Sequence, residues 1–194
     1  MTAERFGAGY YRRFYERAPV HTAVTIGHLA EGTLHFAAWW GIRIRSVLDV
    51  GAGPGLWRDW FAEQHPGVRY RSTDVSAYAC ERYGHEQRDI ATWVPRSRYD
   101  LVVCQGVLQY LDNRAATAAI ENLGCATRHL LYLEVPTLHD HEHVIDADAT
   151  DLDCHWRTGM WYRRRLEPHF VQVGAGLWAH REGAVRFYEL ERAR

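Results

Sequence analysis

The sequence lacks lysine entirely, so all 23 of its basic residues are arginines, and 24 acidic residues bring the net charge to −1. Proteins that bind nucleic acid through its phosphate backbone carry a surplus of basic residues. The balanced charge therefore argues against a broad nucleic-acid interface, and we expect no nucleic-acid partner.

Long apolar runs and paired cysteines are also missing. No stretch approaches the roughly twenty apolar residues that a membrane-spanning helix needs, and no signal peptide is recognisable. The four cysteines lie far apart without a C-x-x-C pair, so we expect free thiols rather than disulfides. These absences predict a cytoplasmic protein without a membrane partner. The 194 residues, 47% of them hydrophobic, are enough for one domain with a full core.

Strand and helix patterns alternate over most of the chain, which is typical of an α/β protein. The strand patterns fall at residues 46–50, 68–73, 85–88 (a weak one), 99–104 and 129–135. A helix that Asp112 caps and Gly124 ends is predicted before the strand at 129–135. Two last strands, 170–180 and 184–190, are predicted to form an antiparallel hairpin around a Glu182-Gly183 turn.

Two helices are predicted ahead of the first strand, at residues 2–17 and 21–40. The first is rich in aromatic residues and ends before Pro19. In the second, Val24 and Phe36 belong to a set of large apolar residues that recur at helical spacing.

Three glycines directly follow the strand at 46–50. Gly51, Gly53 and Gly55 alternate with other residues, and a helix pattern begins immediately after them. Glycines in such a turn let the backbone approach a ligand closely, and the new helix offers unpaired N–H groups. The spacing is not the G-x-G-x-x-G of a dinucleotide site, because Leu56 stands where that pattern continues. The motif therefore argues against a NAD-dependent oxidoreductase.

Two aspartates beside the glycine turn indicate the ligand. Asp49 precedes Gly51 by two residues; its charge would repel a pyrophosphate and favour a cation. Asp74 ends the second strand, nineteen residues after Gly55, where a carboxylate can accept hydrogen bonds from both hydroxyls of a ribose. A ligand that combines an adenosine with a cationic group would suit both aspartates.

These features resemble the class I S-adenosylmethionine-dependent methyltransferase superfamily, and segments 6–15, 104–110 and 159–166 are similar to a group of small bacterial members. The resemblance implies a Rossmann-like three-layer α/β sandwich, whose seven-stranded, mostly parallel sheet ends in an antiparallel hairpin. It divides the chain into an N-terminal helical cap at 1–40 and a methyltransferase domain at 41–194. Residues 136–158 would be an insert that shapes the acceptor site.

The resemblance also implies S-adenosylmethionine as the cofactor and S-adenosylhomocysteine as the product. The glycines would line the methionine part, Asp49 would lie near its ammonium group, and Asp74 would hold the ribose. The residues expected to bind the cofactor are Tyr11 in an aromatic lid, Asp49, Gly51, Gly53, Gly55, Asp74, Val75 beside the adenine, Asp89 at its amino group, Ile90 on its ring, and Gln105 near the sulfonium.

The superfamily has no universal catalytic residue, because its cofactor is already activated and the protein mainly positions the reactants. Tyr110 follows the strand at 99–104 and would border the methyl group. Glu134 ends the next strand and points either to the substrate or to a loop amide. His155 in the insert is a candidate general base, or a surface residue. Histidines and aspartates are frequent between 138 and 155, but they form no compact ligand signature; we expect no metal.

The sequence thus predicts methyl transfer to an oxygen or nitrogen atom of a small aromatic or apolar molecule, by a monomer or a homodimer. The alternative is a protein that binds S-adenosylmethionine without methyltransferase activity, as a cyclase, a decarboxylase or an accessory subunit. Release of S-adenosylhomocysteine during turnover distinguishes the two hypotheses.

Overall fold

A seven-stranded sheet forms the centre of the molecule. The structure, a computed structural model, describes residues 5–17, 19–191 and 193. The strands follow the order β3-β2-β1-β4-β5-β7-β6 across the sheet; β1 to β5 are parallel, and β7 is antiparallel to both of its neighbours. The expected mostly parallel sheet with a final hairpin is confirmed. The strands are β1 (Ser46–Val50), β2 (Arg69–Asp74), β3 (Glu86–Gln87), β4 (Tyr99–Gln105), β5 (Thr127–Glu134), β6 (Phe170–Gly174) and β7 (Leu177–His180).

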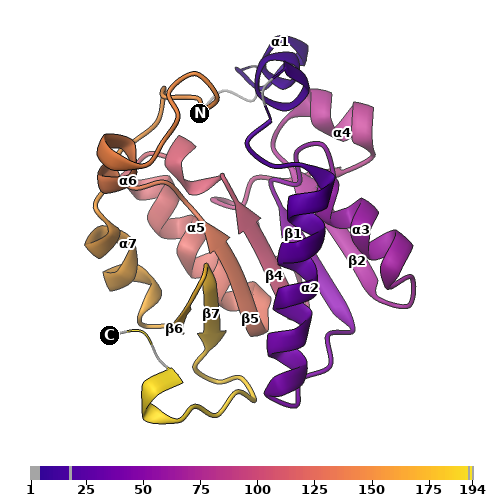
Figure 1. Ribbon diagram of the computed structural model, residues 1–194, viewed down its shortest axis with the longest axis vertical. Helices are drawn as coiled ribbons and strands as arrows, with labels where there is room; N and C mark the ends of the chain where they lie inside the picture. The colour runs from indigo at the N-terminus through magenta and orange to yellow at the C-terminus, as the bar shows by residue number, and fades with distance from the viewer. Residues whose placement is uncertain (1–4, 18, 192, 194) are drawn as a thin grey trace.

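The helices cover both faces of the sheet, and α1 lies beyond one end of its strands (Figure 1). None of those in the described part of the chain is long and apolar enough to cross a membrane. The α-helices are α1 (Ala8–Tyr11), which continues as a π-helix (Arg12–Arg17), α2 (Ala23–Trp39), α3 (Leu56–Gln64), α4 (Ala77–Tyr83), α5 (Asn113–Ala126), α6 (Leu138–His143) and α7 (Gly159–Leu166). The start of the helix predicted at 2–17 lies outside the described residues.

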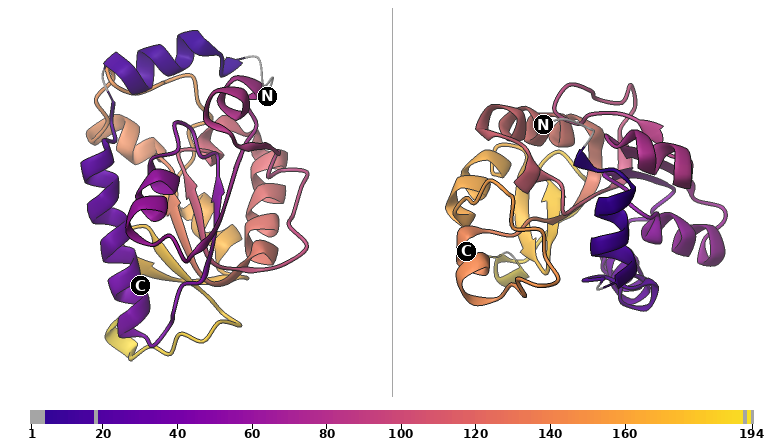
Figure 2. Two further views of the ribbon diagram at one scale, coloured as in Figure 1. Left: turned by 90° about the vertical axis from the view of Figure 1, so that its right-hand side faces the viewer. Right: turned by 90° about the horizontal axis from the view of Figure 1, so that it is seen from above.

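Alternate residues of the central strands pack into two separate cores. In β4, Leu101 and Val103 lie in the core under α2 and α3, whereas Val102 and Cys104 lie in the core under α5 and α7. This alternation is the period-two pattern of a strand buried on both faces. Figure 2 shows α2 and α5 on opposite sides of the sheet, which confirms the three-layer sandwich.

Helix α2 buries a different face from the one its large apolar residues suggest. Ile26, Ala30 and Ala37 are buried, whereas Val24 and Phe36 are 69% and 49% exposed. The buried face is the one with small residues, because α2 lies close to α3: a Cβ atom on Gly27 would be 3.2 Å from Trp60. Close approach between two helices outweighs the size of the apolar side chains.

The hairpin predicted around Glu182-Gly183 was placed wrongly. Strands β6 and β7 pair across a two-residue turn, Ala175-Gly176, whose φ angles are +49° and +79°. Two positive φ angles give the turn twist that suits a two-residue hairpin. Residues 184–190 form no strand; Val185 packs into the core with α2 and Phe187 stacks edge-on against Trp40.

Gly124 does not end its helix, as was predicted, because α5 continues to Ala126. A Cβ atom on Gly124 would lie 2.6 Å from the ring of His169, so the glycine permits close packing instead. Asp112 does cap α5, by accepting from the amide of Ala115 at 2.8 Å. The segment at 136–158, read as irregular, contains the short helix α6.

Two truncations on α2 test which of its faces is buried. Ile26→Ala removes a fully buried side chain, and we expect it to lower the free energy of unfolding by about 2–4 kcal/mol. Val24→Ala removes exposed surface and should change it by less than about 0.5 kcal/mol. Urea denaturation of the two variants measures both values. Equal losses would show that α2 packs through another face.

Candidate active site

The site lies at the edge of the sheet where the parallel strands end. The chain leaves β1 at Gly51, β2 at Asp74, β4 at Gln105 and β5 at Glu134. Parallel strands bring their carboxyl ends to one edge, and an open α/β sheet binds ligands where its strand order reverses. Here the order reverses between β1 and β4. Residues 6–15, which we call the aromatic segment, include α1 and cross this same end of the sheet (Figures 1 and 2).

The glycine turn after β1 has the backbone that only glycine adopts without strain. Gly51, Gly53 and Gly55 have φ angles of +68°, +57° and +85°. A Cβ atom on Gly51 would overlap Cγ2 of Val107, and one on Gly53 would be 3.4 Å from the hydroxyl of Tyr15. The first two glycines therefore line a narrow space that side chains would fill, whereas Gly55 serves as the N-cap of α3.

Asp74 is buried against this turn. Its Oδ2 accepts from the amide of Gly53 at 3.0 Å, and its Oδ1 accepts from the amide of Ser76 at 2.8 Å. Burial raises the pKa of Asp74, and the two backbone hydrogen bonds oppose this rise. Each carboxylate oxygen keeps a further lone pair, so Asp74 can both hold the turn and accept from a ligand.

Asp49 lies beneath the turn, fully enclosed. Its only described hydrogen-bond donor is the hydroxyl of Tyr70, at 2.8 Å from Oδ2. Burial raises the pKa of the Asp49 carboxyl from 3.8 to about 7, although this hydrogen bond opposes the rise. A cationic group placed nearby would favour the ionised form.

His85 supports the turn from the other side and was not identified from the sequence. Its ring nitrogens bond to Oγ of Ser72 at 2.8 Å and to the carbonyl of Gly53 at 3.0 Å. Little in the sequence indicated this role: His85 only began a weakly predicted strand, which in the structure is the two-residue strand β3. His85 ties the glycine turn to β2.

The aromatic segment closes over the turn. Oγ of Ser76 donates to the carbonyl of Phe6 at 2.6 Å, and the hydroxyls of Tyr10 and Tyr110 are 2.7 Å apart. Tyr11 stacks on Tyr15 with ring centroids 5.2 Å apart. Burial raises the pKa of each of these tyrosines, so they are neutral hydroxyls at physiological pH.

Two small cavities flank the glycine turn. The Asp74 cavity, of about 50 Å³, is lined by Asp74, Val75, the turn and the aromatic segment, including Tyr11. The Asp49 cavity, of about 90 Å³, is lined by Asp49, Gln105, Glu134 and the same turn. Seven of the ten residues expected to bind a cofactor therefore line one or both of these cavities.

A third and larger cavity lies beyond them. This insert cavity, of about 390 Å³, is bounded by the aromatic segment, Tyr110, Glu134 and the segment from Pro136 to Asp151. Tyr15 and Gly106 line all three cavities. These two residues thus form a shared wall of all three cavities.

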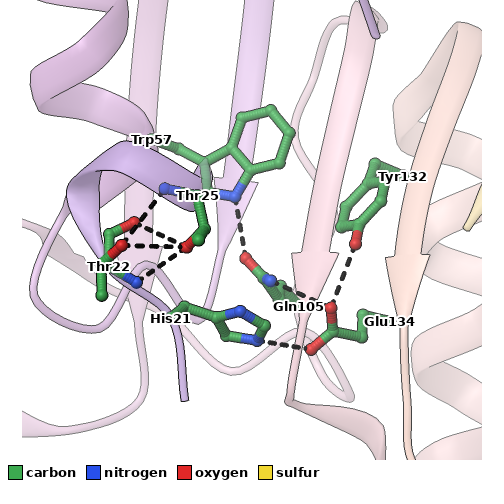
Figure 3. A network of polar contacts seen from close by, with 7 residues as sticks. All are labelled: His21, Thr22, Thr25, Trp57, Gln105, Tyr132 and Glu134. Carbon is green, nitrogen blue, oxygen red and sulfur yellow. Dashed lines mark hydrogen bonds and ion pairs between the residues drawn. The ribbon is translucent and has the colours of Figure 1, made fainter. Parts of the chain in front are cut away.

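Glu134 is the centre of a polar network where the cavities meet (Figure 3). It accepts from Nε2 of Gln105 at 3.1 Å and from the hydroxyl of Tyr132 at 3.1 Å, and its Oε1 is 2.8 Å from Nε2 of His21. Trp57 donates in turn to Oε1 of Gln105 at 2.8 Å. Glu134 thus binds the side-chain amide of Gln105 and lines the insert cavity.

His21 was not identified from the sequence either. It precedes Thr22, which forms a reciprocal capping box with Thr25 at the start of α2. This cap sets where the helix begins, and so places His21 over the end of β5, as Figure 3 shows. A histidine just before a helix cap carries no signal for a partner 113 residues away.

Four of the predicted residues line none of these cavities, and one of them, Gly55, is the N-cap of α3 described above. Asp89 accepts from the amide of Ala91 at 2.9 Å, as in a local turn. Ile90 is buried in the core under α5. His155 is exposed, and its amide donates to the carbonyl of Gln109. Among the described residues no group of histidine, cysteine, aspartate and glutamate could hold a metal ion.

The role of Gly51 can be tested against a matched glycine. Gly51→Ala adds a side chain at positive φ that also overlaps Val107, whereas Gly84 has a φ of +78° with nothing within 4 Å of its Cβ position. We expect Gly84→Ala to cost about 1 kcal/mol in stability and Gly51→Ala clearly more. The double variant Gly51→Ala/Val107→Ala should recover part of the difference. Equal costs in urea denaturation would contradict the tight packing.

The buried carboxyl of Asp49 should make the stability of the fold depend on pH. The folded protein binds this proton more tightly than the unfolded chain, so the free energy of unfolding should fall as pH rises from 3.8 to about 7. Asp49→Asn removes this loss while keeping an acceptor for Tyr70. At about pH 8 we expect the variant to be more stable than the wild type, by up to about 4 kcal/mol, with little difference near pH 4. Urea denaturation at both pH values is the measurement, and a variant that is less stable at both contradicts it.

Comparisons with known proteins agree with this geometry. Residues 10–180 match the model of a methyltransferase domain family. None of the curated proteins matches the sequence.

Several solved structures share the fold at low sequence identity. Magnesium protoporphyrin IX methyltransferase (ChlM) from Synechocystis PCC 6803, with bound SAM, has 18% identity and a TM-score of 0.57, over 92% of this chain and 91% of that one. The plantazolicin methyltransferase BpumL in complex with SAH has 15% identity and a TM-score of 0.62, over 83% of this chain and 66% of that one. An O-methyltransferase family protein from Burkholderia thailandensis has 13% identity and a TM-score of 0.54; the match covers 83% of this chain but only 58% of that one.

The family model covers most of the chain, and the sheet is the expected seven-stranded, mostly parallel one with a final antiparallel hairpin. The chain belongs to the class I S-adenosylmethionine-dependent methyltransferase superfamily, as the sequence predicted.

Proposed function

We propose that this protein transfers a methyl group from S-adenosylmethionine to an oxygen or nitrogen atom of a small aromatic or apolar molecule. One observation carries the proposal: two cavities at the glycine turn and a larger apolar cavity meet at Tyr15 and Gly106. Methyl transfer requires a cofactor and an acceptor to meet in line at one point.

The residues at the glycine turn fit the cofactor. Asp49 and Asp74 offer carboxylates for an ammonium group and a ribose, and Gly51 and Gly53 leave room for the backbone to approach a ligand. Gln105 reaches the methionine side of this region. When bound, S-adenosylmethionine supplies a methyl group that its sulfonium has already activated.

The proposed cofactor-binding set is narrower than the one expected from the sequence. It keeps Tyr11, Asp49, Gly51, Gly53, Asp74, Val75 and Gln105. Gly55 acts through the start of α3, and we leave Asp89 and Ile90 out because they line no cavity of the site.

The aromatic segment is proposed to act as a lid. The Asp74 cavity measures about 50 Å³, whereas sites for ligands of nucleoside size measure roughly 300 Å³ or more. Tyr11 and Tyr15 would therefore move outward when the cofactor enters. Of the cap predicted at residues 1–40, only the aromatic segment would therefore move, whereas α2 stays packed on the sheet.

The insert cavity is the proposed acceptor site. Its walls are mainly apolar, with Phe14, Val135, Val144 and Ile145 among them, which suits an aromatic or aliphatic body. The segment at 136–158 supplies one wall, as proposed from the sequence. Tyr110 borders both this cavity and the Asp74 cavity. We further propose a cytoplasmic protein that acts as a monomer or homodimer.

The second candidate function is binding of S-adenosylmethionine without methyl transfer. The closed lid suits this function as well as methyl transfer, because a protein that only binds the cofactor also needs to cover it. Release of S-adenosylhomocysteine with an acceptor present separates the two functions.

Calorimetry with S-adenosylmethionine and S-adenosylhomocysteine tests the cofactor site. Asp74→Ala removes the proposed ribose acceptor, and we expect it to weaken both ligands at least about a hundredfold. Asp89→Ala, whose carboxylate lies outside the cavity, should bind as the wild type does. Because Asp74 also holds the turn, thermal unfolding of each variant controls for folding. Binding of NAD, or no binding of either ligand by the folded wild type, would contradict the proposal.

A further inference from the structure

The charges of the insert cavity are all of one sign, apart from a histidine. Its lining contains Glu134, Asp140 and Asp151, together with His21, and no arginine of the described chain lines it. The sequence has no lysine to supply a positive charge. An apolar cavity with carboxylates in its wall suits a ligand that combines an apolar body with a positive charge.

These three carboxylates are not equivalent. Asp151 is neutralised by Arg5, whose guanidinium lies 2.6 Å from it. Oδ2 of Asp140 accepts from the amide and hydroxyl of Thr137, both at 2.8 Å, as part of the cap of α6. Glu134 alone lies where the insert cavity meets the Asp49 cavity. It is therefore the carboxylate nearest to the proposed point of methyl transfer.

Glu134 is held in its ionised form by neutral donors and one histidine. Burial raises the pKa of Glu134, but hydrogen bonds from His21, Gln105 and Tyr132 outweigh burial and bring the pKa below its usual value. No arginine pairs with it among the described ion pairs, in which His21 is its partner. The negative charge of Glu134 is thus available to a cation in the cavity.

His21 offers a proton acceptor at the same place. When Nε2–H donates to Glu134, the neutral ring carries its lone pair on Nδ1. In the described chain, Nδ1 of His21 has no hydrogen-bond partner. A histidine oriented by a carboxylate is the usual arrangement of a general base.

We propose that the methyl acceptor is an amine on an apolar body, which binds as an ammonium ion against Glu134 and is deprotonated by His21. The ammonium N–H bond breaks, its proton passes through an intervening water molecule to Nδ1 of His21, which lies on the far side of the ring from Glu134, and the electron pair stays on the amine nitrogen. The free amine is then the nucleophile, and the imidazolium returns its proton to solvent after product release. This inference rests on the proposed function and narrows its acceptor from oxygen or nitrogen to nitrogen.

The negative charge of Glu134 in the cavity wall disfavours acceptors other than amines. A carboxylic acid would bring a second negative charge beside Glu134, at a cost that the low polarity of the cavity increases. An alcohol or a phenol would fit the cavity but would gain no ion pair from Glu134.

Two matched sets of probes test the charge preference: phenethylamine, phenethyl alcohol and phenylacetic acid, and tryptamine, tryptophol and indoleacetic acid. Binding is measured by calorimetry to the protein saturated with S-adenosylhomocysteine. We expect each amine to bind at least about tenfold more tightly than its alcohol, and each acid to bind most weakly. Glu134→Gln should abolish the amine preference.

A second pair of residues provides the control. Glu121 and His169 form a pair of the same length, 2.8 Å, which lies outside the three cavities. Glu121→Gln should leave the amine preference unchanged. Binding of S-adenosylhomocysteine, measured first for every variant, separates failure of this inference from failure of the proposed function.

His21→Gln tests the proton transfer, because the glutamine amide can still donate to Glu134 but has no basic nitrogen. We expect amine binding to stay within about twofold and formation of methylated amine from S-adenosylmethionine to slow at least about a hundredfold. His169→Gln should react like the wild type. A preference for the alcohol or the acid, an amine preference that survives in Glu134→Gln, bound amines that are never methylated, or an unchanged rate in His21→Gln would overturn the proposal.

Discussion

The whole site depends on one constraint, which is that β1, β2, β4 and β5 run parallel and end at the same edge of the sheet. A strand that ended one residue earlier or later would turn its last side chain to the opposite face. The strand order reverses between β1 and β4, so the chain leaves β1 toward α3 and leaves β4 toward α5, on opposite faces. The crevice between them is narrow, and for this reason Gly51 must lack a side chain opposite Val107.

Three carboxylates gather at this edge, and each is stabilised by different means. Burial keeps Asp49 largely protonated below about pH 7, backbone amides hold Asp74, and side-chain donors hold Glu134. None of them has a described arginine partner within ion-pair distance, although arginine is abundant elsewhere on the chain. Burying three carboxyl groups close together without a cation costs stability, because each loses favourable hydration when it ionises. The cost is offset when cationic ligands bind, which connects the instability of the site to its proposed use.

Sequence patterns located most of this arrangement, and their failures have physical reasons. The strand at 46–50 was predicted with both ends correct, because a buried apolar run meets a glycine turn there. The final hairpin was misplaced because Ala175 takes a positive φ angle, which β-turn preferences assign to glycine or asparagine. Helix α6 was missed, although Thr137 and Asp140 have the spacing of a capping box. The contact of His21 with Glu134 could not be predicted from the sequence, because the two residues come together only when α2 packs on the sheet.

The contacts of the aromatic segment explain why the proposed lid, and not the sheet, would move to admit a ligand. Phe6, Tyr10, Tyr11 and Tyr15 pack on one another, on α4 and on Tyr110, in a cluster separate from the two main cores. Among the described residues, no backbone–backbone hydrogen bond joins the segment to the sheet; Oγ of Ser76, the N-cap of α4, holds the carbonyl of Phe6. Local opening occurs where buried contacts are few and separate from the core. A ligand that filled the Asp74 cavity would replace tyrosine contacts with its own, so opening for entry and closing over the ligand would leave both cores intact.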